Sequence, residues 1–139
     1  MSAYNKFNVF VSDLASGVHD FATNDIKVML TDTAPVATNT IKSNIVEIAA
    51  GNGYTAGGIQ ATLVSDIDTA GLYKLILAQV SWTASGGSMA QFRYAVVYNS
   101  TPANGNLIAW FDFGAEVNLT NGNTFTVALD QTNGIFTLQ

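Results

Sequence analysis

Hydrophobic and polar positions recur with two different periods along the chain. The first period is helical and runs through residues 7 to 18, where the apolar positions are Phe7, Phe10, Val11, Leu14 and Val18. This spacing is typical of one face of an amphipathic helix. A strand over the same residues would leave Phe10 on the polar face, and Gly17 suits the C-terminal end of a helix. The pattern therefore predicts one short helix near residues 5 to 16.

From Asp25 onward the period changes to two and the apolar segments become short. Candidate strands are residues 26–31, 59–64, 73–82, 92–99, 107–113, 124–129 and 135–138. Asn-Gly pairs begin at positions 52, 104, 121 and 133. Because Asn-Gly supplies the positive φ of tight hairpins, we expect the last three to join neighbouring antiparallel strands. The spacing predicts an all-β fold, an antiparallel β-sandwich or barrel that is jelly-roll-like, with the one N-terminal helix.

Two of these strands, 73–82 and 107–113, are apolar on both faces. One face can enter the core, so the other must be covered by the helix, by a loop or by another protein. The least regular stretch is 31–58, and a connection of that length is usually functional, flexible or a sign of a missed strand. Residues 45–49 are the candidate for such a strand.

Composition narrows the class of protein. The 139 residues are most simply one β domain, 1–139, with 48% hydrophobic and only 11% charged residues, against about 25% charged in a typical domain. The five Lys and Arg are scattered singly among ten Asp and Glu, so we expect no nucleic-acid or membrane partner. The absence of cysteine excludes thiolate catalysis and Cys-based zinc sites.

The N-terminal apolar residues are interrupted by Lys6 and Asp13, and no apolar run approaches the length of a membrane span. We therefore expect no secretory signal, and a soluble protein that is made and kept inside a cell, or released only when that cell breaks.

Candidate catalytic residues are few. His19 is the single histidine, and with no nucleophile motif nearby it is expected to be a structural or surface residue. Asp66 and Asp68 lack the further acids of a calcium loop, which favours a solvated turn. Asp112 and Glu116 are four residues apart across an expected turn, which does not indicate the facing carboxylates of a glycosidase. We expect no enzyme activity, no metal, no cofactor and no small-molecule substrate.

Aromatic residues gather in the middle strands, at Trp82, Tyr94, Tyr98, Trp110, Phe111 and Phe113. Core packing is the favoured interpretation, because strands bury aromatic side chains. The alternative is a glycan-binding β-sandwich module, which would expose Trp82, Trp110 or Tyr98 in a groove.

Residues 51–58 read GNGYTAGG, which raises the question of a phosphate-binding loop. A P-loop would continue with Lys and then Ser or Thr, whereas Ile59 and Gln60 follow here. The dinucleotide fingerprint would require a helix to follow, but the next residues alternate as in a strand. The stretch therefore predicts a turn that needs the backbone freedom of glycine.

Five stretches carry a resemblance that spans nearly the whole chain: FNVFVSDLASGVHD (7–20), DIKVMLTDTAP (25–35), EIAAGNGYTAGG (47–58), FRYAVVYN (92–99) and TFTV (124–127). In these the chain resembles small virion proteins of tailed bacteriophages, of the head decoration or cement type. The resemblance implies a structural protein made in the host cytoplasm and located on the capsid surface of the virion. Its partners would be the major capsid protein and copies of itself. The alternatives are a structural protein of the phage tail or fibre, and the glycan-binding module.

The candidate protein interface is the glycine-rich segment, with Gly51, Asn52, Gly53, Tyr54, Gly57 and Gly58. We expect Tyr54 to be its anchor, since tyrosine offers a large contact area at low entropic cost. The competing hypothesis is that Tyr54 packs on its own strands and only shapes the loop. With so few cations, binding should depend on apolar and neutral polar contacts and change little with salt.

Overall fold

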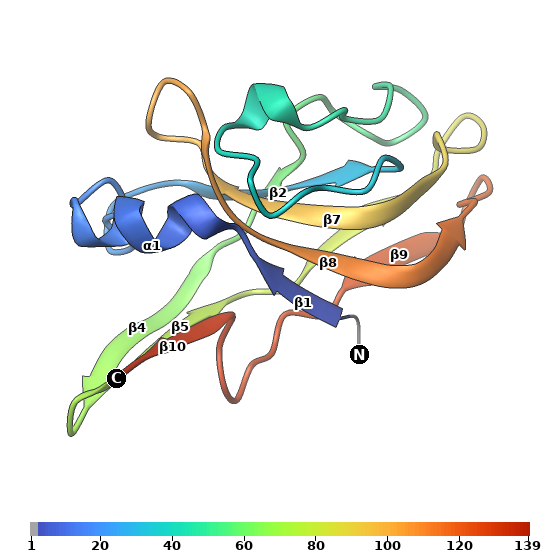
Figure 1. Ribbon diagram of the computed structural model, residues 1–139. Coiled ribbons are helices and arrows are strands. Elements are labelled where there is room, and N and C mark those ends of the chain that lie inside the picture. Colours follow the sequence, from blue (N-terminus) through green and yellow to red (C-terminus); the bar gives the residue numbers. More distant parts are fainter. Residues whose placement is uncertain (1–2) are drawn as a thin grey trace.

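The computed structural model describes residues 3–139 (Figure 1). Its strands are β1 (Ala3–Lys6), β2 (Ile26–Thr31), β3 (Ile59–Gln60), β4 (Leu63–Thr69), β5 (Leu72–Leu77), β6 (Val80–Thr83), β7 (Phe92–Asn99), β8 (Asn106–Val117), β9 (Thr124–Val127) and β10 (Phe136–Leu138). Its helices are α1 (Asn8–Ala15) and the short 3-10 helix η1 (Lys42–Asn44). Every strand pairing is antiparallel. The predicted all-β, sandwich-like fold with one short N-terminal helix is confirmed.

The strands form two layers. One layer is a five-stranded sheet in the order β1-β8-β7-β2-β3. The other consists of the sheet β10-β5-β4, which lies below the first layer in Figure 1, and the pair β6-β9. Side chains from both layers meet in one apolar cluster that includes Val28 and Ile108 of the first layer and Leu75 and Trp82 of the second.

Helix α1 covers one end of this core. Phe7 immediately precedes it, and Phe10 is its buried residue. Val11 was expected on the same face but is 54% exposed, because only Phe10 and Leu14 of the helix face the core. Gly17 has the positive φ expected after a helix C-terminus, and the Val18 N–H donates back to the Asp13 carbonyl at 2.9 Å.

Two of the expected strands are each divided between two sheets. The predicted strand 59–64 becomes β3, which pairs with β2, and β4, which pairs with β5. The predicted strand 73–82 likewise becomes β5 and β6, in different sheets. Apolar residues continue to recur where the chain passes from β3 to β4 and from β5 to β6. The pattern in the sequence therefore does not reveal that the pairing partner changes there.

Other differences arise at turns and at the N-terminus. Strand β1 was not predicted, although Tyr4 of this strand pairs directly with Phe111 of β8. Residues 45–49 form no strand and contribute only an isolated bridge from Glu47 to Thr31. Of the three Asn-Gly turns, the one at 104 joins the neighbours β7 and β8 as predicted. The turns at 121 and 133 lead instead to strands that pair elsewhere, β9 with β6 and β10 with β5, so that prediction was wrong for them.

The five-stranded sheet is buried on both faces. Its outer face holds a second apolar cluster, in which Phe7 and Ile45 cover Met29, Val96 and Leu107. The second face of β8 is therefore covered from within the chain, by the segment before α1 and by the irregular connection around η1.

Candidate interaction site

Tyr54 of the glycine-rich segment is an interior residue. Its side chain is 3% exposed, and its ring lies 6.3 Å from that of Trp82. Its hydroxyl accepts the Leu30 N–H at 3.1 Å and donates to Glu47 Oε1 at 2.6 Å. Burial, and after it the bond to Glu47, raises the pKa of Tyr54 well above its ordinary value. The expectation that Tyr54 anchors a partner is therefore wrong, because the ring is needed in the core of its own chain.

The glycines around Tyr54 are required by the conformation of the backbone. Asn52 and Gly53 both have positive φ, of 53° and 102°, and they close a tight turn between Gly51 and Tyr54. At Gly58, with φ +78°, an added Cβ would lie 1.9 Å from the Val28 carbonyl oxygen. Gly51, Asn52 and Gly53 are exposed, whereas Gly57 is buried and Gly58 is half-buried. Only the turn at 51–53 presents the predicted interface to solvent.

Glu47 ties this segment to the outer face of the five-stranded sheet. Besides the Tyr54 hydroxyl, its Oε1 accepts the Gly57 N–H at 2.5 Å, and its Oε2 lies 3.8 Å from Lys42 Nζ. The Tyr98 hydroxyl of β7 donates to the Gly57 carbonyl at 2.7 Å. Burial, helped by the nearby Glu47 charge, raises the pKa of Tyr98 to about 12. These contacts make the connection between β2 and β3 a fixed part of the surface.

The outer face of the hairpin formed by β4 and β5 is uncovered. β4 is an edge strand of its sheet, and the turn that joins it to β5 lies at the lower left end of the molecule in Figure 1. Ile67 on this face is 60% exposed, and Val64, at the register shift in β4, is 57% exposed. Ile67 lies opposite Lys74 and next to Ile76, at a groove of about 350 Å³ that also includes Leu72, Thr69 and Thr132. Exposed apolar side chains on an edge strand are unusual and are a common feature of protein interfaces.

His19 is packed into the core below α1. It is 7% exposed, and its ring lies 5.6 Å from Phe21 and 5.4 Å from Phe10. The Asn99 amide lies 3.1 Å from Nδ1, while Nε2 has no hydrogen-bond partner among residues 3–139. Burial lowers the pKa of His19, and the nearby Asp13 charge opposes this effect. These surroundings give the histidine a structural position.

The acidic residues considered in the sequence lie in two strands, Asp66 and Asp68 in β4 and Asp112 and Glu116 in β8. Asp112 forms a two-point pair with Arg93, at 2.9 and 3.2 Å, which together with the Gly114 N–H lowers the pKa of Asp112. Glu116 is exposed further along β8. Asp66 and Asp68 lie within strand β4, so the expected solvated turn was wrong there. Across residues 3–139, no group of three or more His, Cys, Asp or Glu could hold a metal ion.

Most of the aromatic cluster is buried, as expected from strand packing. Trp82, Tyr94, Tyr98 and Phe111 are buried, whereas Phe113 and Trp110 are half-buried. The Trp110 ring packs against Phe7 with centroids 4.6 Å apart. A glycan-binding surface built on Trp82 or Tyr98 is therefore excluded, and Trp110 alone of the three residues reaches the surface.

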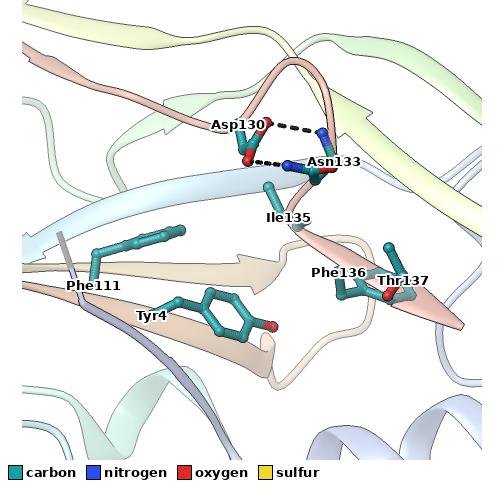
Figure 2. Close-up of a pocket in the computed structure, with 8 residues that line it drawn as sticks. Tyr4, Phe111, Asp130, Asn133, Ile135, Phe136 and Thr137 are labelled. Carbon is teal, nitrogen blue, oxygen red and sulfur yellow. Dashed lines mark hydrogen bonds between the residues drawn. The ribbon is translucent and has the colours of Figure 1, made fainter. Parts of the chain in front are cut away.

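A separate groove of about 280 Å³ lies at the seam between the two layers. Figure 2 shows Tyr4 and Phe111 on one side of it and the segment from Asp130 to Thr137 on the other. The Tyr4 ring is 40% exposed and meets Phe111 edge to face at 5.6 Å. The Asp130 carboxylate accepts bonds from Asn133 and Thr132, which lower its pKa and close the turn.

Comparison of the chain with protein-family models, with curated proteins and with solved structures found no match. None of the helices in residues 3–139 has the length and apolar character needed to cross a membrane.

Proposed function

We propose that this protein is a structural protein of a tailed-bacteriophage virion, and that it binds the assembled head lattice and stabilises it. Its partners are then the major capsid protein and neighbouring copies of itself, on the capsid surface. The proposal is supported by the resemblance of the five sequence stretches to decoration and cement proteins. The structural observation that carries it is the uncovered apolar face of the β4–β5 hairpin.

This face has the properties that lattice binding requires. Complete burial of a side chain such as Ile67 contributes about 1.5 to 3 kcal/mol relative to full exposure. Ile67 is 60% exposed, so much of that free energy is still available for binding. A single weak contact of this kind becomes effective when many copies act on a repeating surface.

A matched pair of variants tests the proposed surface. Ile67→Thr keeps a β-branched residue in the strand and removes most of its apolar area. Val11→Thr makes a similar change at an exposed position of α1, away from the hairpin. Each variant is mixed with undecorated particles of the phage, and bound copies are counted from gel densitometry over a concentration series. We expect roughly tenfold weaker binding for Ile67→Thr, corresponding to about 1.4 kcal/mol, and unchanged binding for Val11→Thr.

Counting the copies in purified virions separates head from tail. Hundreds of copies per virion are expected for a protein that covers the capsid lattice. A handful of copies would contradict the head location and favour the alternative, a structural protein of the tail or fibre.

One observation still favours the glycan-binding alternative: the Trp110 ring on the outer face of β8 is partly exposed. Aromatic rings at the surface stack on sugars, so a glycan array probed with the native protein and with Trp110→Ala tests this class directly. A signal that Trp110→Ala abolishes would replace capsid decoration as the proposed function.

A further inference from the structure

A polar pocket lies beside the glycine-rich segment, on the outer side of the five-stranded sheet. It has a volume of about 280 Å³ and is lined by Lys27, Lys42, Tyr98, residues 56–57, Ser100 and residues 102–105. Two of the chain's five cationic side chains thus meet in one cavity, in a protein with a net charge of −5. Neither the apolar face of β4–β5 nor the proposed function accounts for this concentration of charge.

The fold brings these groups together from distant parts of the sequence. Lys27 of β2 is the direct cross-strand partner of Tyr98 in β7, and residues paired in this way project from the same face of the sheet. Lys42 begins η1, and its Nζ lies 5.7 Å from the centroid of the Tyr98 ring. Tyr98 therefore lies between the two lysine-bearing elements.

The walls of the pocket are held by hydrogen bonds. Tyr98 is bonded to the Gly57 carbonyl, and the Lys42 N–H donates to the Gly105 carbonyl at 2.8 Å. A Cβ on Gly57 would lie 3.6 Å from Lys42 Nζ and 3.5 Å from the Tyr98 hydroxyl, so it would occupy the pocket itself. At Gly105 an added Cβ would lie 2.9 Å from the Lys42 Cβ. The absence of side chains at these two positions keeps the cavity open next to the lysine.

The positive charge in the pocket is only partly compensated. The ion pairs formed within residues 3–139 are Lys42 with Glu47, at 3.8 Å, and Arg93 with Asp112. Lys27 therefore has no carboxylate at ion-pairing distance in this part of the chain. Glu47 is also shared with the Tyr54 hydroxyl and the Gly57 N–H. Two ammonium groups against one shared carboxylate leave a local positive charge that an anionic oxygen group would neutralise.

We propose that this pocket is an oxyanion-binding site, in which Lys27 and Lys42 donate to the oxygens of a phosphate or carboxylate group. Ammonium groups bind both chemistries through short charge-assisted hydrogen bonds. The phosphate group would belong to a small molecule, and the carboxylate to a small acid or to an acidic side chain. The site is independent of capsid binding, so its test uses the isolated protein.

The test is a titration of the isotope-labelled protein followed by amide NMR at constant pH and ionic strength. Inorganic phosphate and acetate are added in separate experiments, each replacing sodium chloride. We expect saturable shifts at the amides of Gly57 and Gly105, which line the pocket. Lys27→Gln and Lys42→Gln should each weaken binding by about tenfold or more, because each removes one charged donor. Lys6→Gln, which removes an exposed lysine of β1, should leave binding unchanged.

The two ions distinguish the source of the ligand. Saturation by phosphate alone assigns the site to a phosphate group, and saturation by acetate alone assigns it to a carboxylate. Saturation by both shows a site that accepts either oxyanion. The proposal is overturned if neither ion gives saturable shifts when it replaces chloride at constant ionic strength. It is also overturned if Lys6→Gln weakens binding as much as Lys27→Gln does. Dispersed spectra of each variant establish that the fold is retained.

Discussion

At the scale of single residues, Tyr54 connects three parts of the chain through one hydroxyl group. It accepts the N–H of Leu30, near the end of β2, and donates to Glu47, which in turn accepts the Gly57 N–H. Leu30 is fully buried, so its N–H has no access to water as a substitute partner. The Tyr54 hydroxyl therefore stabilises the fold of its own chain, and the buried ring offers almost no exposed area to a partner.

This arrangement predicts the effect of removing only the oxygen. Tyr54→Phe should lower the free energy of unfolding by about 1 to 3 kcal/mol, because a buried N–H and a half-buried carboxylate each lose a partner. Tyr4→Phe, at an exposed ring, should change it by less than about 0.5 kcal/mol. Urea denaturation measures both. An unchanged midpoint for Tyr54→Phe would show that the hydroxyl is not satisfying these groups.

His19 predicts a pH dependence of stability. Its pKa in the folded protein is below the ordinary value of 6.5, mainly because of burial. As the pH falls below about 6.5, the unfolded chain takes up a proton that the folded protein does not, so the free energy of unfolding decreases. The loss continues until the pH passes the folded pKa. The lowered pKa values of Asp112 and Asp130 act only at more acidic pH, below the ordinary carboxyl value of 3.8.

The measurement is urea denaturation at several values between about pH 7.5 and 5, a range that includes the ordinary histidine pKa. The native protein should lose stability across this range, and His19→Gln should give a flat profile there, whatever its absolute stability. A flat profile for the native protein would mean that the imidazole can be protonated without cost in the folded state.

At the scale of elements, the connection from β2 to β3 depends on close contact between backbones. Gly58 reaches β2 so closely that a methyl group would overlap the Val28 carbonyl. Gly122 has a similar φ, +87° against +78°, but an added Cβ there would meet nothing within 4 Å. Substitution at Gly122 thus measures the cost of backbone strain alone. Substitution at Gly58 adds the cost of a steric overlap with β2.

Gly122→Ala should therefore lower the free energy of unfolding by about 1 to 2 kcal/mol, the cost of a left-handed backbone for a residue with a Cβ. Gly58→Ala should cost more than about 3 kcal/mol or prevent folding, because β2 and β3 must also move apart. Circular dichroism during thermal unfolding compares the two. Equal losses at both positions would contradict the close contact.

At the scale of the whole molecule, apolar and charged binding features occupy different surfaces. The exposed apolar face belongs to β4 and β5, whereas the lysine pocket lies between β2, η1 and the turn from β7 to β8. Salt should therefore affect two interactions of one protein differently, since added ions screen exposed charges but leave apolar contacts largely intact.

Raising sodium chloride from about 0.05 to 0.5 M, which shortens the screening length about threefold, should change occupancy on capsid particles little. The same change should weaken phosphate or acetate binding in the pocket severalfold. Sedimentation of decorated particles and the NMR titration provide the two readouts. Strongly salt-sensitive occupancy would mean that charged contacts, and not the β4–β5 face, hold the protein to the lattice.

The amino-acid sequence by itself determined the fold class, the positions of most strands and the helix around Phe10. These are local properties: side-chain spacing follows the period of the element, and Gly17 and Asn104-Gly105 have the backbone preferences of a helix end and a turn. It also indicated that GNGYTAGG forms a turn, but it left open whether His19 lies in the structure's interior or at its surface.

Only the tertiary structure decided which strands pair and which apolar faces are covered. The crossings after β3 and after β5 keep the same alternation, so local spacing contains no information about the partner. Whether Tyr54 faces solvent depends on Leu30 and Glu47, which lie 24 and 7 residues away in the sequence. The meeting of Lys27 with Lys42, and the exposure of Ile67, depend in the same way on contacts between distant segments, because burial and charge are properties of neighbours in space.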